Sequence, residues 1–264
     1  MLTAITRAVS RSLADCELTW LEREPIDIDR AIEEHHAYER CLKRLGARVI
    51  SLPALEEYPD AVFVEDPAIV LDEVAVITSM GAVSRRGERA SLAAALAGYR
   101  KILQMQPPGC LEGAPGCLEG GDVMRIGHCL YCGLSGRTDQ AGIAELRGLI
   151  GNLGYQVHAV ELHGCLHLKS ACSNIGDDTV LLNPEWVDGA GFTGCRLIPV
   201  AAGEPHAANA LRVGTTVVMP SAFPATAALL RAAGFQVETL EMTELMKAES
   251  GVTCSSLVFR RSAL

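Results

Sequence analysis

The amino-acid sequence predicts an α/β protein in which a unit of two strands, a helix and a further strand recurs about five times. Its 264 residues are 49% hydrophobic and 21% charged, which allows a sizeable core and argues against disorder. Segments with the periodicity of strands outnumber helical ones, and each helical segment follows two or three strands. No linker rich in serine and glycine divides the chain, so we expect one domain over residues 1–264.

The helical segments share apolar residues three and four positions apart. They cover 26–45, 85–100, 138–153, 224–233 and, as a short helix, 241–247. Gly46 and Gly154 stand where two of these helices would end, which is typical of helix C-termini. The strand segments are short and rich in apolar and β-branched residues. They cover 48–52, 61–64, 68–71, 74–78, two strands within 122–131, then 156–160, 168–172, 180–182, 213–219, 234–240 and the run after Cys254.

The charge balance limits the partners that the protein can have. Lysine and arginine number 23 and acidic residues 32, for a formal charge of −9. This balance argues against a nucleic-acid surface, which needs a dense basic patch, and suits a cationic small molecule. The first residues lack the apolar stretch of a secretory signal, and no segment has the ~20 apolar residues of a membrane helix. We therefore expect a cytoplasmic protein that is not attached to a membrane.

The ten cysteines are scattered over the chain, which favours reduced thiols over a disulfide framework. Cys129 and Cys132 have the spacing of redox and zinc motifs, but no second pair follows and the segment reads as a strand. His163 and His167 have the spacing of two metal ligands on a helix, but Gly164 between them makes a helix a poor prediction. We interpret both pairs as structural and expect no metal site.

Cys254 is the strongest candidate for a reactive side chain. It follows the flexible Gly251 and precedes a short apolar strand, so its thiol would be presented at a strand entrance. A buried, inert cysteine is the common alternative. His167, between two leucines, would by itself be an ordinary core histidine. Beside a thiol and a carboxylate it would serve as a general acid and base.

Carboxylates and arginines supply a second group of candidates. Asp60, Glu65 and Asp66 surround a short apolar segment, and adjacent carboxylates repel each other unless a cation lies between them. Arg85 and Arg137 each lie just before a predicted helix or at its start. Arginine holds carboxylates with two parallel hydrogen bonds. The solvated end of a strand remains the alternative for the acidic residues.

A local duplication offers two glutamates for one role. The segment 108–113 recurs as 115–120, with Glu112 and Glu119 at equivalent positions. Glu119 is followed by Gly120, Gly121 and a predicted strand, which would fix its position. Glu112 is followed by Gly-Ala-Pro, which cannot continue into a strand. We expect Glu119 to be functional and Glu112 to be a solvated bystander.

Six short motifs occur in the order seen in dimethylarginine dimethylaminohydrolases, and the resemblance extends from Thr6 to Phe259. They are Phe63-Val-Glu-Asp66, Glu119-Gly-Gly-Asp-Val123, Gly133-Leu-Ser-Gly-Arg-Thr138, His167-Leu-Lys-Ser170, Ala207-Ala-Asn209 and Gly251-Val-Thr-Cys-Ser-Ser256. The resemblance implies the pentein fold, a five-bladed α/β propeller of ββαβ modules. It also implies hydrolysis of methylated L-arginine to L-citrulline and dimethylamine or methylamine, without a cofactor. A homodimer is one of the assembly states that it leaves open.

The same resemblance implies roles for individual residues. Cys254 would be the nucleophile, His167 the acid and base, and Glu119 the carboxylate that orients His167. Glu65 and Asp66 would hold the substrate guanidinium.

The remaining roles concern the amino-acid end of the substrate. Asp60 and the backbone carbonyls of Leu18 and Ala248 would bind the α-amine, and Arg85 and Arg137 the carboxylate. Two departures from the family pattern are the duplication before Glu119 and the Glu249-Ser250 step, where Asp-Gly is expected.

Three other functions compete with this interpretation. Arginine deiminases are larger, with a helical insertion, and have an aspartate two residues after their histidine, where this chain has Lys169. Amidinotransferases are also longer chains. A non-catalytic pentein, such as the ribosome anti-association factor, has no need of Cys254, His167 and Glu119 together. The sequence leaves open the preference among dimethylarginine, monomethylarginine and free arginine.

Overall fold

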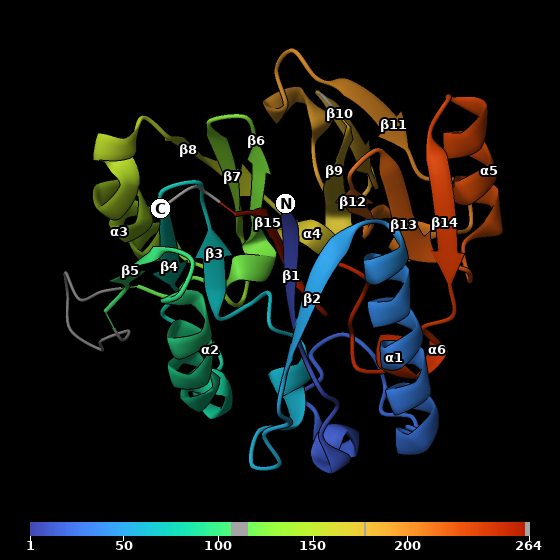
Figure 1. The fold of residues 1–264 in the computed structure, drawn as a ribbon. Helices are drawn as coiled ribbons and strands as arrows, with labels where there is room; N and C mark the ends of the chain where they lie inside the picture. Colours follow the sequence, from blue (N-terminus) through green and yellow to red (C-terminus); the bar gives the residue numbers. More distant parts are fainter. Residues whose placement is uncertain (107–115, 177, 262–264) are drawn as a thin grey trace.

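Five three-stranded sheets stand in a ring in the computed structural model, which describes residues 1–106, 116–176 and 178–261 (Figure 1). In each sheet the middle strand pairs antiparallel with one neighbour and parallel with the other. Four sheets have consecutive strands, namely β3-β4-β5, β6-β7-β8, β9-β10-β11 and β12-β13-β14. The fifth joins both ends of the chain as β15-β1-β2. The predicted five-bladed α/β propeller is confirmed.

The strands are short, as the alternating apolar runs predicted. Their bounds are β1 Leu2–Arg7, β2 Ala47–Leu52, β3 Ala68–Val70, β4 Val74–Ile77, β5 Lys101–Gln104, β6 Val123–Ile126, β7 Cys129–Leu134, β8 Gln156–Glu161, β9 Cys172–Gly176, β10 Thr179–Leu182, β11 Arg196–Pro199, β12 Leu211–Val213, β13 Thr216–Pro220, β14 Gln236–Leu240 and β15 Leu257–Arg260. The first strand of every module (β3, β6, β9, β12 and β15) contributes residues to a hollow at the centre of the ring.

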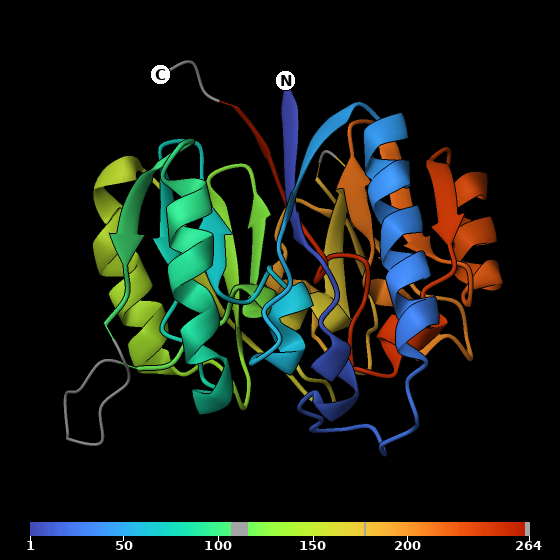
Figure 2. The same ribbon diagram turned by 60° about the horizontal axis from the view of Figure 1, so that its bottom comes forward.

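Helices lie on the outside of the ring and connect the two parallel strands of a module (Figures 1 and 2). They are α1 Ile28–Arg44, α2 Arg89–Leu96, α3 Gln140–Ile150 and α5 Pro224–Ala232. The module β9-β10-β11 has a short 3-10 turn, Gly189–Gly191, in this place. Two further short helices, α4 Leu168–Ala171 and α6 Thr243–Met246, lie in the segments that lead into β9 and β15. A crossover through a helix is the usual way to join parallel strands.

Helix α1 shows why this segment is helical. Asp27 caps its first turn by accepting a hydrogen bond from the backbone N–H of Arg30, and Gly46 follows its end with a φ of 90°. Its apolar face is buried against the sheet β15-β1-β2 and the chain that precedes β15. Tyr38 on this face donates a hydrogen bond to the carbonyl of Val252 at 2.8 Å and lies 2.6 Å from Ser256 Oγ. The helix therefore supports the segment that carries Cys254.

The structure differs from the expected secondary structure in several places. Residues 59–62 form a 3-10 turn and not a strand, because Pro59 begins the turn. Residues 168–171 form helix α4, because Asp122 accepts a hydrogen bond from the backbone N–H of Leu168 at the start of that helix. The expected helix 85–100 divides into a 3-10 segment, Val83–Glu88, and α2. Strands β1, β5, β11 and β12 were not predicted; the expected strand 213–219 corresponds to β13.

The part of the chain that the structure describes contains no helix with both the length and the hydropathy needed to cross a membrane.

Replacing Tyr38 with phenylalanine tests the support that α1 gives to the segment before β15. The change leaves a buried carbonyl and a buried hydroxyl without their partner, so we expect a loss of about 1–3 kcal/mol in the free energy of unfolding. Urea denaturation measures it. Tyr99→Phe is the matched control. It also removes a tyrosine hydroxyl, but it keeps the ring, which makes the edge-on contact with Phe259. An equal loss in both variants would contradict a specific role for the Tyr38 hydroxyl.

Candidate active site

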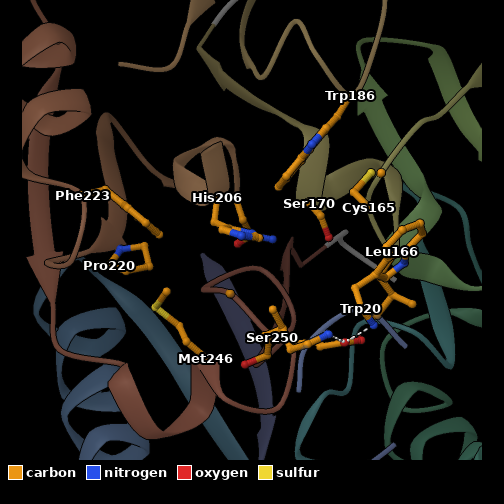
Figure 3. Close-up of a pocket in the computed structure, with 15 residues that line it drawn as sticks. Trp20, Cys165, Leu166, Ser170, Trp186, His206, Pro220, Phe223, Met246 and Ser250 are labelled. Carbon is orange, nitrogen blue, oxygen red and sulfur yellow. Dashed lines mark hydrogen bonds between the residues drawn. The ribbon is translucent and has the colours of Figure 1, made fainter. Parts of the chain in front are cut away.

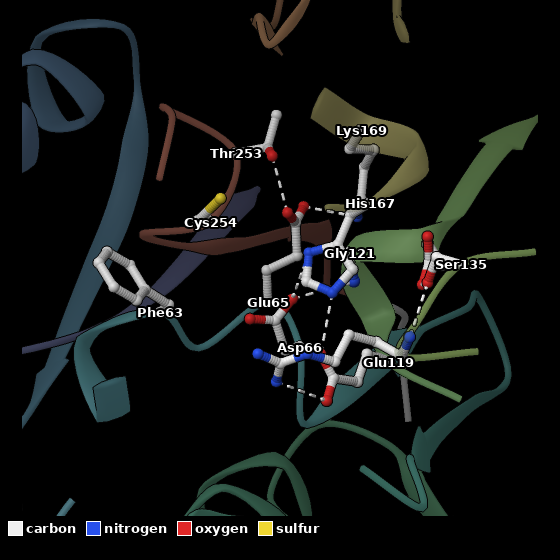
Figure 4. Close-up of polar contacts among 12 residues, drawn as sticks. Phe63, Glu65, Asp66, Glu119, Gly121, Ser135, His167, Lys169, Thr253 and Cys254 are labelled. Carbon is white, nitrogen blue, oxygen red and sulfur yellow. Dashed lines mark hydrogen bonds and ion pairs between the residues drawn. The ribbon is translucent and has the colours of Figure 1, made fainter. Parts of the chain in front are cut away.

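The candidate residues share one position in the fold, the segment just before the first strand of a module. Cys254 precedes β15, Asp66 precedes β3 and Glu119 precedes β6. His167 precedes α4 and β9, and Asn209 precedes β12. Because these first strands surround the centre of the ring, the five segments converge at one end of it, and Figure 4 shows the four that carry Asp66, Glu119, His167 and Cys254. The repeat therefore brings together side chains that are distant in the sequence.

The loop that carries Cys254 is held by Asn209. The Asn209 amide donates to Thr253 Oγ1 at 3.0 Å, and its oxygen accepts from the Thr253 N–H at 3.1 Å. Gly251 passes so close that a Cβ there would lie 2.3 Å from Asn209 Oδ1, which explains the glycine. The Gly251 N–H points to Cys254 Sγ at 3.4 Å. The thiol is half-buried and has a fixed position.

His167 and Glu119 form a buried pair. His167 Nε2 lies 2.9 Å from Glu119 Oε2, and Glu119 is fully buried. The other oxygen of Glu119 accepts from the Ala82 N–H at 3.0 Å. Gly121 permits the close packing, since a Cβ there would lie 2.7 Å from His167 Nδ1. The second ring nitrogen, Nδ1, lies 3.8 Å from Asp66 Oδ1, beyond hydrogen-bond distance, and is the nitrogen that can act on a substrate.

The charges around His167 shift its pKa. Burial would lower this pKa, but the carboxylates of Asp66, Asp122 and Glu119 raise it to about 9. For Glu119, burial acts in the opposite direction and would raise the pKa. Its hydrogen bond to His167 and the nearby arginines nevertheless hold the pKa of Glu119 below the usual range. The pair is therefore ionised at neutral pH, with a proton on each nitrogen of His167.

The Cys254 thiol has the opposite shift. Burial, together with the carboxylates of Glu65 and Asp66, raises its pKa to about 12. The side chain is therefore a neutral thiol in the free protein at neutral pH. A cation placed beside it would counter the two carboxylates and favour the thiolate.

One small cavity brings seven of the ten predicted site residues together. They are Asp60, Asp66, Arg85, Arg137, His167, Ala248 and Cys254. Phe63, Leu166, Glu17, Glu249 and Ser250 complete the lining. Of the other predicted residues, Glu119 lies behind His167, and Leu18 follows Glu17 in the loop at the rim. The cavity is acidic on the side of Asp60 and Asp66, as a cationic substrate requires.

Glu65 is placed differently from the expectation. Its carboxylate faces the central hollow, with Oε1 2.5 Å from Lys169 Nζ and Oε2 accepting from Thr253 Oγ1 at 2.7 Å (Figure 4). A buried carboxylate needs such partners. Asp66 alone of the pair lines the cavity. Lys169 was not assigned a role from the sequence, although its place two residues after His167 was noted.

Arg85 is also engaged within the protein. Its guanidinium pairs with Glu88 at 2.9 Å and with Asp66 Oδ2 at 2.6 Å, and it donates to the carbonyls of Asp60 and Phe63. It is buried, and these contacts orient Asp66. Arg137 makes a longer and less buried ion pair, since its guanidinium lies 3.3 Å from the exposed carboxylate of Glu17. The two arginines that the sequence treated alike are therefore not equivalent.

The same cluster contains three groups that could hold a metal ion. Ligand atoms of Asp66, Glu119 and His167 lie within 4.8 Å of one another. Arg85 pairs with Asp66, however, and Arg137 NH1 lies 3.7 Å from Glu119 Oε1. The raised pKa of His167 also keeps its imidazole protonated at neutral pH, whereas a metal ligand must be a neutral imidazole. The arrangement suits proton transfer better than metal binding.

The other candidates of the sequence lie elsewhere. Cys129 and Cys132 lie on β7, and all nine cysteines among the described residues are free. Glu112 lies outside the described residues.

A five-module ring with a cysteine and a histidine in one cavity at its end defines the pentein class of guanidine-modifying enzymes. A family model described as "N,N dimethylarginine dimethylhydrolase, eukaryotic" matches residues 16–190. The chain is 34% identical to the N(G),N(G)-dimethylarginine dimethylaminohydrolase of Pseudomonas aeruginosa, over 97% of this chain and 98% of that protein. It is 36% identical to the protein of that name from Streptomyces coelicolor, over 97% and 96% of the two chains.

A solved structure agrees with this assignment. The Pseudomonas aeruginosa enzyme, as a cysteine-to-serine mutant complexed with citrulline, superposes with a TM-score of 0.91 at 32% identity, covering 98% of this chain and 100% of that one. The chain belongs to the dimethylarginine dimethylaminohydrolase family.

The Glu119–His167 pair gives a pH-dependent prediction. Glu119→Gln removes a charge that stabilises the imidazolium, so the pKa of His167 should fall below about 9 and the alkaline limit of activity should move to lower pH. We expect turnover at neutral pH to fall about 100-fold. NMR titration of the histidine and a pH–rate profile measure the two effects.

Glu112→Gln, the same change in the other copy of the duplicated segment, is the control and should leave turnover nearly unchanged. The reverse pattern would show that the first copy enters the site.

Proposed function

We propose that this chain hydrolyses the guanidinium of Nω-methylated L-arginines, giving L-citrulline and dimethylamine or methylamine. The observation that carries the proposal is one cavity lined by Cys254, His167 and Asp66, with Glu119 behind the histidine. Related structures support it. The similar enzyme of known structure was solved with citrulline, and a histidine-to-glycine variant of a dimethylarginine dimethylaminohydrolase was solved as an adduct with S-methyl-L-thiocitrulline.

The cavity suggests how the substrate lies. Asp66, with its position fixed by Arg85 and by the Gly121 N–H at 3.2 Å, would accept hydrogen bonds from the guanidinium. Arg137 would bind the substrate carboxylate in place of Glu17. The α-amine would lie near Asp60 and the backbone carbonyls of Leu18 and Ala248. Charged groups at both ends would align the central guanidinium carbon with Cys254.

Two apolar side chains favour a methylated substrate. Phe63 and Leu166 line the cavity together with Cys254. Methyl groups on the guanidinium would gain apolar contact there, whereas free arginine would expose two more N–H groups to apolar surface. We therefore propose methylated arginines as the preferred substrates over free arginine.

The reaction follows from the protonation states of the free protein. The bound guanidinium lowers the pKa of Cys254, so the thiol releases its proton to solvent and the resulting thiolate attacks the central carbon. His167 gives its Nδ1 proton to the departing amine, and a thiouronium linked to Sγ remains. His167 then removes a proton from water, and the hydroxide adds to the same carbon. The adduct gives up its hydroxyl proton as the C–S bond breaks, citrulline leaves, and the sulfur regains a proton, which restores the resting thiol.

We propose the cytoplasm as the compartment. The described cysteines are all free, which suits a reducing environment.

A substrate panel tests the proposed function. Purified protein should release citrulline from dimethylarginine and monomethylarginine faster than from arginine, and Cys254→Ser should fold but release none. The physical reason is that a serine hydroxyl is a far weaker nucleophile than a thiolate at neutral pH. Colorimetric citrulline detection and circular dichroism measure both points. Preferred turnover of free arginine would contradict the substrate, and near-parent turnover by Cys254→Ser would contradict the covalent mechanism.

His167→Ala separates chemistry from binding. The histidine transfers a proton in both half-reactions, so we expect kcat to fall by at least about 100-fold with a much smaller change in KM. Steady-state kinetics on dimethylarginine measure both constants. A raised KM with an unchanged kcat would make His167 a binding residue and would require another proton donor.

A further inference from the structure

The carboxylate of Glu249 connects two segments of the cavity, its own segment before β15 and the rim loop, residues 17–21. Glu249 accepts hydrogen bonds from three successive backbone N–H groups, those of Thr19 at 2.9 Å, Trp20, and Leu21 at 2.5 Å. Consecutive N–H groups that point to one place form an anion-binding concavity. The residues are about 230 positions apart in the sequence, so the contact joins the start of the chain to its end.

The backbone of Glu249 is unusual. Its φ of 54° lies in the left-handed region, which is unfavourable for an L-residue with a side chain. The strained conformation is retained where surrounding contacts outweigh this cost. The three hydrogen bonds to the carboxylate are contacts of that kind, because charge-assisted bonds are about twice as strong as neutral ones.

The two segments that Glu249 joins both belong to the cavity. Leu18 immediately precedes the three N–H groups, and Ala248 immediately precedes Glu249. These are the two residues whose backbone carbonyls would bind the α-amine. Glu249 itself lines the cavity and also lines a larger apolar hollow beside it, whose rim is formed by Trp20 and Ser250 (Figure 3). The loop therefore forms a wall of both spaces.

We propose that Glu249 is a positioning residue, which holds the loop 17–21 closed and fixes the distance between the carbonyls of Leu18 and Ala248. This inference rests on the proposed function.

The loop has other contacts as well: the Glu17 N–H donates to Asp60 Oδ2 at 3.1 Å, and the Glu17 carboxylate makes an ion pair for which substrate would compete. Glu17 lies 3.3 Å from Arg137, the arginine that the substrate carboxylate would take. When substrate binds, that ion pair is given up. The Glu249 contact involves backbone N–H groups and is not in the path of the substrate carboxylate. It can therefore keep the loop in place at the moment when the α-amine is bound.

The experiment uses Glu249→Gln and Glu249→Ala, with Glu249→Asp as the conservative variant that keeps the charge. Amide hydrogen exchange of residues 19–21 should speed up about tenfold in the first two and less in the third. KM for dimethylarginine should rise about tenfold in the same two variants, with kcat within about threefold of the parent. Glu22→Gln, which removes an exposed charge from the same loop, is the matched control and should leave exchange and KM unchanged.

Several results would overturn the proposal. One is unchanged exchange at residues 19–21 in Glu249→Gln and Glu249→Ala. Another is faster exchange with an unchanged KM, which would mean that the loop is ordered by Glu249 without a consequence for binding. An equally large rise in KM in Glu22→Gln would show that KM responds to the loss of any negative charge near the loop and not to the Glu249 hydrogen bonds.

A parent protein with no turnover of methylated arginines would refute the proposed function. The exchange measurement would still decide whether Glu249 orders the loop.

Discussion

The 2.9 Å contact between His167 and Glu119 is the interaction on which the candidate site depends. A fully buried carboxylate is costly unless it is paired, and here the histidine and the Ala82 N–H supply the partners. To make the pair, three modules must approach closely. Gly120 shows how closely, since a Cβ there would lie 2.0 Å from the carbonyl oxygen of Glu65. The glycines after Glu119 are therefore a requirement of packing as well as of chain flexibility.

Charges alternate around this pair. Lys169 neutralises Glu65 on the side of the central hollow, and Arg85 lies between Asp66 and Glu88 at the wall of the cavity. Each buried charge thus has an opposite neighbour, which lowers the cost of keeping so many ionised groups away from water. Neighbouring carboxylates still favour the neutral thiol of Cys254. A bound cation changes that balance, so the same charges that bind a guanidinium keep the nucleophile protonated until one arrives.

Apolar patterns predicted the repeat, and the resemblance of short motifs to a known family named most of the residues that line the candidate cavity. Alternating apolar runs marked most strands, and glycines marked two helix ends. The segment 61–64 was mistaken for a strand because its apolar residues resemble one, whereas Pro59 begins a 3-10 turn there. The orientation of Glu65 could not be predicted, since it depends on Lys169, 104 positions away. The difference between Arg85 and Arg137 likewise depends on neighbours from other modules.

The closure of the ring explains why the candidate nucleophile lies so near the end of the chain. Strand β15 follows Cys254 at once and pairs antiparallel with β1, with Ile5 opposite Leu257. The position of the thiol therefore depends on the pairing of this last strand with the first module. The Tyr38 hydroxyl and the Glu249 carboxylate connect the segments on either side of Cys254 to the N-terminal part of the chain. The nucleophile, the rim loop and the substrate cavity therefore all depend on contacts between residues of the N-terminal and C-terminal parts of the chain.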